Sequence, residues 1–157
     1  MLGREYGQNC SAARTLELIG ERWTMLVIRD VFSGRRRFDQ IQESLGVARN
    51  VLSSRLQLLV DEDILEKRVY QEKPERHEYF LTEKGLDLWP ILVALIGFGD
   101  KHLSPEEGGP PVLILHKGCD GRVNDRRICE RCGAQLGVRD AYAAPGPGAE
   151  RQLGKAA

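Results

Sequence analysis

Apolar residues recur at helical spacing near the start of the chain. Ala12, Leu16 and Ile19 are four and three residues apart, so they share one side of a helix, and Gly20 follows as a typical helix end. The run from Trp23 to Val31 continues with the same period and contains one polar exception on its apolar side. The pattern therefore predicts two consecutive helices in this part of the chain.

Two further helices are predicted close together. Apolar positions between Phe38 and Leu45 fit a short third helix, which Gly46 closes. Leu52, Leu56 and Leu59 form the core face of a fourth helix, which begins after a connection of only a few residues. Two helices joined by such a tight turn are typical of the helix-turn-helix motif.

A two-stranded hairpin is predicted after the fourth helix. Segments 64–70 and 77–81 are rich in Val, Ile, Tyr, Phe and Leu, and they flank the turn-rich loop 72–76. Three helices followed by such a hairpin make a winged helix. We therefore expect the loop to lie along the minor groove or backbone of DNA, beside the helix that enters the major groove.

The region from Glu83 to about Leu103 is apolar nearly all round and predicts one long helix, with Thr82 as its N-cap. Pro90 lies inside this range, and it should remove one backbone hydrogen bond and kink the helix. One apolar surface of such a helix can pack on its own domain. The second must be hidden from water elsewhere, most simply against another copy of the chain, so the pattern predicts a homodimer.

The face of the fourth helix opposite its leucines carries small hydrogen-bonding side chains. Asn50, Ser53, Ser54 and Gln57 share this face at helical spacing, and Arg49 stands at its amino-terminal end. Amide, hydroxyl and guanidinium groups are the side chains that read base edges in the major groove. A polar helix face can also be merely solvated, and the neighbouring hairpin favours DNA binding over that reading.

Charge is balanced over the whole chain but uneven along it. Lys and Arg number 23, and so do Asp and Glu, so no global field would draw the chain onto nucleic acid. Any such binding must come from a local patch, and residues 29–55 hold six arginines against three acids. Arg35, Arg36 and Arg37 form the densest part of this patch. Lys73 and Arg76 in the hairpin loop should add one or two phosphate or minor-groove contacts.

Three of the four cysteines, together with a histidine, have the spacing of metal ligands. His116 and Cys119 are separated by two residues, as are Cys129 and Cys132, which lets each short turn present two ligands to one ion. Three thiolates and one imidazole suit tetrahedral Zn²⁺, and a site filled by four protein ligands is structural. Ordinary thiols or a dithiol pair remain the alternative, and an iron–sulfur cluster usually asks for four cysteines.

The segment 112–142 that holds these ligands has few large apolar residues, and a piece this small needs a metal or disulfide to hold it together. The sequence leaves open whether it contacts the winged helix, helps dimerisation or touches DNA through its arginines. We expect a mainly α (α+β) fold with a winged helix-turn-helix DNA-binding and dimerisation domain in residues 1–103. A linker at 104–111, a zinc-ribbon-like module at 112–142 and a disordered tail at 143–157 follow.

No stretch is apolar and long enough to span a membrane, and the amino terminus lacks the apolar run of a secretion signal, so a cytoplasmic location without a membrane partner is expected. Ordered motifs between residues 10 and 103 resemble the HxlR-type family of bacterial winged helix-turn-helix transcription regulators. The motifs are Cys10, Leu16-Glu-Leu-Ile-Gly-Glu-Arg-Trp23, Gly34-Arg-Arg-Arg-Phe38, Leu52-Ser-Ser-Arg-Leu56, Arg76-His-Glu-Tyr79, Leu81-Thr-Glu-Lys-Gly85 and the stretch from Pro90 to Gly99.

The resemblance implies a dimeric regulator, usually a repressor, whose first and last helices form the dimer contact and whose recognition helix lies near residues 48–60. Ala48 departs from the family, which usually has serine or threonine there. Alanine cannot cap a helix, so about 1 kcal/mol of capping is lost, and phosphate binding should rely on Arg49 and the backbone amides of the helix terminus.

Cys10 stands where several members of the resembled family carry a redox or electrophile sensor. A sensor thiol must be accessible and partly ionised, which a helix amino terminus favours. The alternative is a small residue buried at the dimer contact. The effector, if there is one, would accordingly be an oxidant or a small molecule.

The sequence as a whole predicts a sequence-specific transcription regulator that binds double-stranded DNA as a homodimer on an inverted repeat, with a structural zinc appendage. The alternative is a winged-helix and zinc-ribbon module that binds proteins without reading DNA sequence. An enzyme is not expected, because the metal ligands fill the coordination shell and no paired acid and base accompany a glycine-rich loop.

Overall fold

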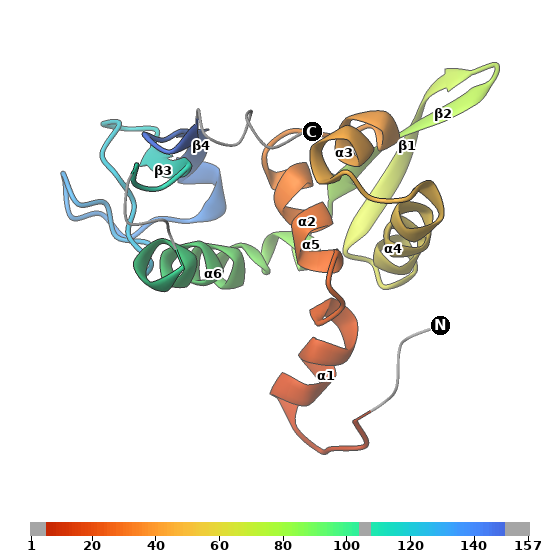
Figure 1. The fold of residues 1–157 in the computed structure, drawn as a ribbon, viewed down its shortest axis with the longest axis horizontal. Helices are drawn as coiled ribbons and strands as arrows, with labels where there is room; N and C mark the ends of the chain where they lie inside the picture. Colours follow the sequence, from red (N-terminus) through yellow and green to blue (C-terminus); the bar gives the residue numbers. More distant parts are fainter. Residues whose placement is uncertain (1–5, 104–107, 150–157) are drawn as a thin grey trace. The chain divides into compact units, whose positions relative to one another are not determined.

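The computed structural model describes residues 6–103 and 108–149. It divides into two compact units, Met1–Asp87 and Leu88–Ala157, and each is described separately. No helix in the described ranges is long and apolar enough to cross a bilayer. The first unit contains, in chain order, α1 (Ser11–Ile19), α2 (Thr24–Phe32), α3 (Phe38–Leu45), α4 (Arg49–Asp61), β1 (Leu65–Glu72), β2 (Glu75–Leu81) and α5 (Glu83–Leu86) (Figure 1).

The first four predicted helices and the hairpin are confirmed, and so is the mixed α+β fold. The core of the first unit joins α2, α3 and α4. Val27 and Ile28 of α2, Ile41 of α3, and Leu52 and Leu59 of α4 are completely buried. Burying each such side chain stabilises the fold by about 1.5–3 kcal/mol before the entropy of ordering is subtracted. This shared core fixes α4 against α2 and α3, so its opposite face is presented to solvent as a rigid surface.

The turn between α3 and α4 depends on Gly46. This residue has a φ of 61°, in the left-handed region that glycine adopts without steric cost, and its amide donates to the Gln42 carbonyl. Ala48 precedes α4 in extended conformation and makes no side-chain cap, as its chemistry requires. The first amides of α4 are therefore left for other acceptors.

The wing formed by β1 and β2 is longer than the sequence predicts. The strands pair antiparallel from Leu65 opposite Leu81 to Glu72 opposite Glu75, with an irregularity between Val69 and Gln71. The loop expected at 72–76 is therefore a tight tip, and Arg76, expected in the loop, lies in β2. Alternation of polar and apolar residues could not reveal this, because most side chains near the tip are solvent-exposed and carry no hydrophobic signal.

The long helix expected from Glu83 to Leu103 is wrong, because the chain forms two helices there. The short α5 ends at Leu86, and α6 (Trp89–His102) begins the second unit. Pro90 lies in the first turn of α6, where its missing N–H would have had no partner, so it starts a helix and does not kink one. Thr82 is confirmed as an N-cap, since its hydroxyl accepts from the Gly85 amide at 3.0 Å.

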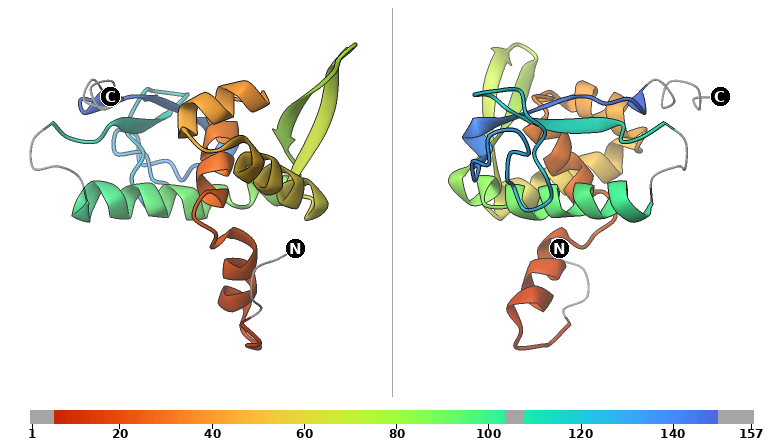
Figure 2. Two further views of the ribbon diagram at one scale, coloured as in Figure 1. Left: turned by 45° about the vertical axis from the view of Figure 1, so that its right-hand side comes forward. Right: turned by 90° about the vertical axis from the view of Figure 1, so that its left-hand side faces the viewer.

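The second unit packs a small sheet beside α6 (Figure 2). Strands β3 (Val112–His116) and β4 (Ala141–Pro145) pair antiparallel, with a single 3-10 turn, η1 (Val138–Asp140), before β4. The disordered tail predicted from residue 143 is wrong for residues 143–145, which belong to β4. Small Ala and Pro side chains carry no strand signal, but their backbone completes the pairing with β3.

The proposed division of the chain at residue 103 differs from the division into compact units, because α6 falls in the second unit. The predicted domain of residues 1–103 and module of residues 112–142 stay predictions about function. Part of the predicted linker, 104–107, and the end of the predicted tail, 150–157, lie outside the described residues.

Candidate nucleic-acid interface and metal cluster

The outer face of α4 is built as the sequence predicts. Asn50, Ser53, Ser54 and Gln57 are all exposed on the side of the helix opposite its three buried leucines. The Gln57 amide donates to Asp61 Oδ1 at 2.7 Å, one turn further along. The structure therefore brings four short amide and hydroxyl side chains together on one solvent-facing surface, with the amide of Gln57 held in a defined orientation.

Arg49 lies at the amino-terminal end of this face. Its guanidinium carbon is 4.7 Å from the centre of the Phe38 ring, which belongs to the first turn of α3. A cation over an aromatic face is held by the ring quadrupole while its N–H groups stay free to donate. The Arg49 side chain and the unpaired backbone amides of the α4 amino terminus can therefore bind the same anion.

The loop between α2 and α3 is anchored by a buried carboxylate. Asp30 is 0% exposed, and its Oδ1 accepts from Nε and Nη2 of Arg29 at 3.1 and 2.8 Å. Arg35 lies 3.8 Å from the same oxygen, and its backbone amide donates to the Asp30 carbonyl at 3.0 Å. A carboxylate can be buried only with such compensation, so Asp30 fixes the start of the arginine loop to the end of α2.

The wing orients the other two arginines of the loop. The guanidinium carbon of Arg36 is 4.4 Å from the centre of the Phe80 ring, and that of Arg37 is 4.4 Å from the Tyr70 ring. Arg37 Nε also donates to Glu78 Oε1 at 3.0 Å, and this hydrogen bond raises the pKa of Arg37. The backbone of Arg37 forms an isolated antiparallel bridge to that of Glu78, which ties the loop to β2.

Arg68 joins this group although the sequence did not single it out. Its guanidinium carbon is also 4.4 Å from the centre of the Phe80 ring, and it pairs with Glu66 on its own strand. One ring therefore holds two cations that come from segments far apart in the sequence. The register of the hairpin was needed to find this arrangement, because Phe80 and Arg68 are brought together only by the pairing of β1 with β2.

The wing tip places Lys73 and Arg76 in solvent at the end of the hairpin. Glu72 and Glu75 pair with each other across the strands at the same point. The balance of charge at the tip is therefore close to neutral. That the wing makes one or two phosphate or minor-groove contacts stays a prediction.

Cys10 is exposed and is the N-cap residue of α1. The backbone amides of Ala13 and Ala12, which point out of the helix amino terminus, lower the pKa of its thiol. A larger thiolate fraction favours reaction of a thiol with oxidants and electrophiles. Cys10 is exposed in the single chain, and its burial at a dimer contact stays the alternative prediction.

His116, Cys119, Cys129 and Cys132 converge as their spacing predicts. One ligand atom from each lies within 4.8 Å of all the others. His116 Nδ1 is 3.3 Å from the sulfurs of both Cys119 and Cys132, and the sulfurs of Cys119 and Cys129 are 3.5 Å apart. The four ligands come from the end of β3 and from two short turns, 116–119 and 129–132, which we call the knuckle turns. Together they present one nitrogen and three sulfurs to a common point, where they could hold a metal ion.

The surroundings of the cluster fit a metal. Backbone amides of Cys132 and Arg131 lower the pKa of Cys129 to about 6, so this thiol gives up its proton readily. A Cβ at Gly121 would lie only 2.5 Å from the Cys129 sulfur, so glycine lets the backbone fold beneath the sulfurs. His77 and His102 are not part of the cluster.

Comparison with known proteins places these features in context. The model of the HxlR-like helix-turn-helix family matches residues 18–107. An HTH-type transcriptional regulator of Mycobacterium tuberculosis is 44% identical over 143 residues, which are 91% of this chain and 90% of the relative. A match of that length has to include the metal cluster as well as the winged helix.

Two solved structures are also similar. PA1607, described as a candidate transcription factor, aligns with a TM-score of 0.67 and 34% identity, covering 85% of this chain and 93% of its own. The redox regulator HypR, in its reduced form, aligns with a TM-score of 0.57 and 26% identity, covering 60% of this chain and 95% of its own.

Proposed function

Because the chain belongs to the HxlR-like helix-turn-helix family of transcription regulators, we propose that it binds operator DNA as a homodimer and represses the genes that the operator controls. The observation that carries this proposal is the exposed face of α4. It holds amide and hydroxyl side chains on a helix whose other side is locked into the core. A helix of this kind fits the major groove.

We assign base reading to Asn50 and Gln57, with Ser53 and Ser54 beside them. Asparagine and glutamine can donate to and accept from the same adenine, so each recognises a base through two hydrogen bonds. Arg49 and the free amides of the α4 amino terminus bind a backbone phosphate. This contact replaces the one that a serine or threonine at position 48 would have made.

Phosphate contacts along the rest of the site come from Arg35, Arg36 and Arg37, and we add Arg68 to this set. Asp30, Phe80, Tyr70 and Glu78 hold these arginines in place, as the distances given above support. Ordering a long side chain costs entropy on binding, so arginines that are already oriented bind phosphate at a lower cost. The wing tip contributes Lys73 and Arg76.

The dimer contact that we propose uses an exposed apolar stripe on α6. Ile91, Leu95 and Phe98 lie at positions i, i+4 and i+7, and they are 38%, 50% and 59% exposed. Burying apolar surface stabilises an interface by about 25 cal/mol per Å². Covering these three side chains with a second copy of the chain would therefore favour a dimer. Leu16 of α1 is also exposed, at 51%, which supports α1 as a second part of the contact.

The metal in this proposal is one structural Zn²⁺ per chain, bound by His116, Cys119, Cys129 and Cys132. Zn²⁺ prefers four tetrahedral nitrogen and sulfur ligands, which is the donor set present. The ion would hold the segment 112–142 together, because its apolar core is small. Elemental analysis of the purified dimer should give about one zinc per chain, whereas iron with a visible charge-transfer band would overturn the assignment.

We also propose that Cys10 makes DNA binding sensitive to oxidants. Its exposure and lowered pKa support this, and the similar HypR structure is described as that of a redox regulator. Formation of a disulfide between the Cys10 residues of two protomers would release two protons and pass two electrons to the oxidant. Diamide should then change the affinity of the wild-type dimer for its operator, but not that of Cys10→Ser.

Genomic selection tests the function. Fragments of the source genome are incubated with purified, metal-loaded protein at near-physiological salt, recovered and sequenced. An enriched inverted repeat upstream of genes whose transcription rises when the protein is deleted would support a repressor. No enrichment, with the same protein shown to be folded and dimeric, would favour the protein-binding alternative.

A further inference from the structure

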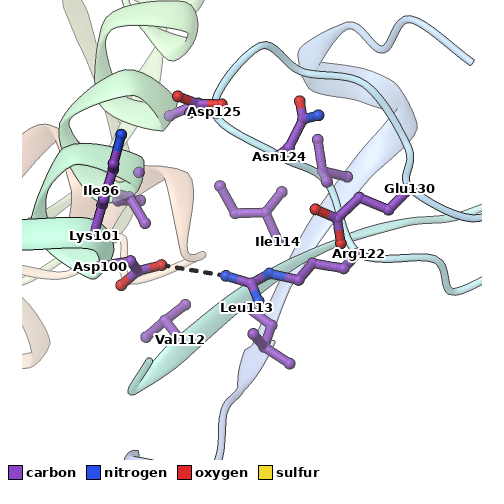
Figure 3. Close-up of a pocket in the computed structure, with 13 residues that line it drawn as sticks. Ile96, Asp100, Lys101, Val112, Leu113, Ile114, Arg122, Asn124, Asp125 and Glu130 are labelled. Carbon is purple, nitrogen blue, oxygen red and sulfur yellow. Dashed lines mark ion pairs between the residues drawn. The ribbon is translucent and has the colours of Figure 1, made fainter. Parts of the chain in front are cut away.

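A cavity lies within the second unit, between α6, β3 and the loops that carry the metal ligands (Figure 3). Its volume is about 390 Å³. This lies at the lower end of the range of about 300–1,000 Å³ that small-molecule sites occupy. The residues assigned above to DNA, metal and oxidants do not line it.

Part of the cavity wall is apolar. Val93 and Ile96 come from α6, Val112 and Ile114 from β3, and Val123 from the loop after Cys119. Val93 and Val123 are buried, and Figure 3 shows Ile114 in the middle of the space between α6 and the metal-bearing loops. An apolar body such as a phenylalkyl group would therefore leave water on entering the cavity.

The rim of the cavity is charged, and acids outnumber bases. Asp100 lies across the space from Arg122, and their charged groups are 3.8 Å apart. Burial raises the pKa of Asp100, with Arg122 acting in the opposite direction. Asp125 and Glu130 make no ion pair in the part of the chain that the structure describes. Lys101 is the remaining base, so the rim keeps an uncompensated negative charge.

We propose that this cavity binds a small organic cation, an amine or quaternary ammonium group attached to a compact apolar body. The cationic head would lie among the rim carboxylates, with Asp125 and Glu130 as its principal partners. The apolar body would cover the valine and isoleucine walls. An anionic ligand would meet a rim in which three carboxylates face two bases, one of them already paired with Asp100, and this balance opposes its binding.

The position of the cavity on α6 gives the ligand a route to the dimer. With 100° per residue, Val93, Gly97 and Asp100 fall on the side of α6 opposite Ile91, Leu95 and Phe98. Ligand therefore contacts one side of the helix while the proposed dimer contact uses the other. This regulatory step rests on the proposed function, whereas binding of the cation does not.

The metal cluster and Gly97 shape the same cavity. Arg122 and Val123 follow Cys119, and Glu130 follows Cys129, so the knuckle turns carry one wall of the cavity. A Cβ at Gly97 would collide with Cβ of Asp125, so glycine lets this rim residue approach α6 closely. A metal ion bound by the cluster would therefore also hold this wall of the cavity in place.

Three probes with the same ten-carbon skeleton test the proposal: 4-phenylbutylamine, 4-phenylbutan-1-ol and 4-phenylbutanoate. Each is titrated into the full-length, metal-loaded protein without DNA, and binding is followed by calorimetry and by NMR shifts of the amides of Val93, Gly97 and Val123. The amine should bind most tightly and the carboxylate least. Tighter binding of the alcohol or the carboxylate, or amine binding without shifts at these amides, would overturn the proposal.

Two neutral variants locate the cationic head. Asp125→Asn and Glu130→Gln should each weaken binding of the amine about fivefold, as expected for an exposed charge contact. Glu43→Gln on α3 should leave the affinity for the amine unchanged. Metal content is measured on each variant, because Glu130 neighbours a ligand. If both rim variants bind the amine as wild type does, the assignment fails. The wild-type probe series decides the matter even if a variant does not fold, and neither result depends on DNA binding.

Discussion

Phe80 is the residue on which the proposed phosphate contacts depend most, because one ring orients both Arg36 and Arg68. Phe80→Leu keeps an apolar side chain but removes the ring face. We expect it to weaken operator binding about fivefold to tenfold, because two exposed cation–π contacts are lost. Phe80→Tyr keeps the ring and is the matched control. Binding titrations at fixed salt give the affinities, and equal loss in both variants would point to a general packing defect.

Base reading and phosphate binding should separate when single residues of the two sets are changed. Asn50→Ala and Gln57→Ala should relax base preference at one position of each half-site. Arg36→Ala should weaken binding to all operator sequences evenly, and it should lower the slope of log affinity against log salt by about 1. Binding to a library of operator variants at several salt concentrations measures both. A uniform loss from Asn50→Ala would contradict the assignment of roles.

Cys10 should react as a thiol of lowered pKa. Because the helix amides favour the thiolate, its alkylation by iodoacetamide should reach half its maximal rate at a lower pH in the folded protein than in guanidinium chloride. The thiolate fraction at neutral pH is correspondingly larger in the folded state. Mass spectrometry of the Cys10 peptide follows the reaction, and coincident pH profiles in the two states would refute the effect of the helix.

At the scale of elements, the sequence was sufficient wherever one face of an element is buried. Leu52, Leu56 and Leu59 defined α4 and its outer face because they repeat with the helical period and are buried. The pattern failed where burial did not mark the element. Apart from Tyr142, β4 has only small side chains, and the wing tip is exposed on both faces, so neither carries a periodic signal.

Pro90 shows a different kind of failure. A proline is tolerated in the first turn of a helix and disruptive inside one, and the apolar run around it continues without a break. The sequence could therefore not tell a kinked helix from two helices. The convergence of His116, Cys119, Cys129 and Cys132 could be predicted because metal chemistry fixes the spacing of ligands. The contact of Arg68 with Phe80 could not, because it depends on the register of the two strands.

The exposed stripe of α6 should govern association. Leu95→Glu places a charge in the middle of the stripe, where dimerisation would have to bury it, so we expect a monomer at concentrations where the wild type is a dimer. Val69→Glu, at an exposed apolar position of β1, changes the net charge by the same amount and is the control. Sedimentation equilibrium measures the two masses. A dimeric Leu95→Glu protein would place the interface elsewhere.

For the whole molecule, removing the metal should unfold the segment 112–142, because its few apolar residues cannot hold it without the ion. Chelation should therefore abolish amide-exchange protection in β3 and in the knuckle turns. Cys132→Ser should behave like the chelated protein, and Cys10→Ser, which keeps all four ligands, like wild type. Protection that survives complete loss of metal would show that the ion is not a structural element.

The measurement that tests the account most directly is hydroxyl-radical footprinting of the metal-loaded protein on a selected genomic site, with the bound mass determined in parallel. The account predicts two protected half-sites in inverted orientation, with centres about 34 Å apart or a multiple of it, and two protomers bound. Gln57→Ala should change base preference at the same position in both halves. A single protected half-site occupied by one protomer, or protection without sequence preference, would contradict a dimeric operator-reading regulator.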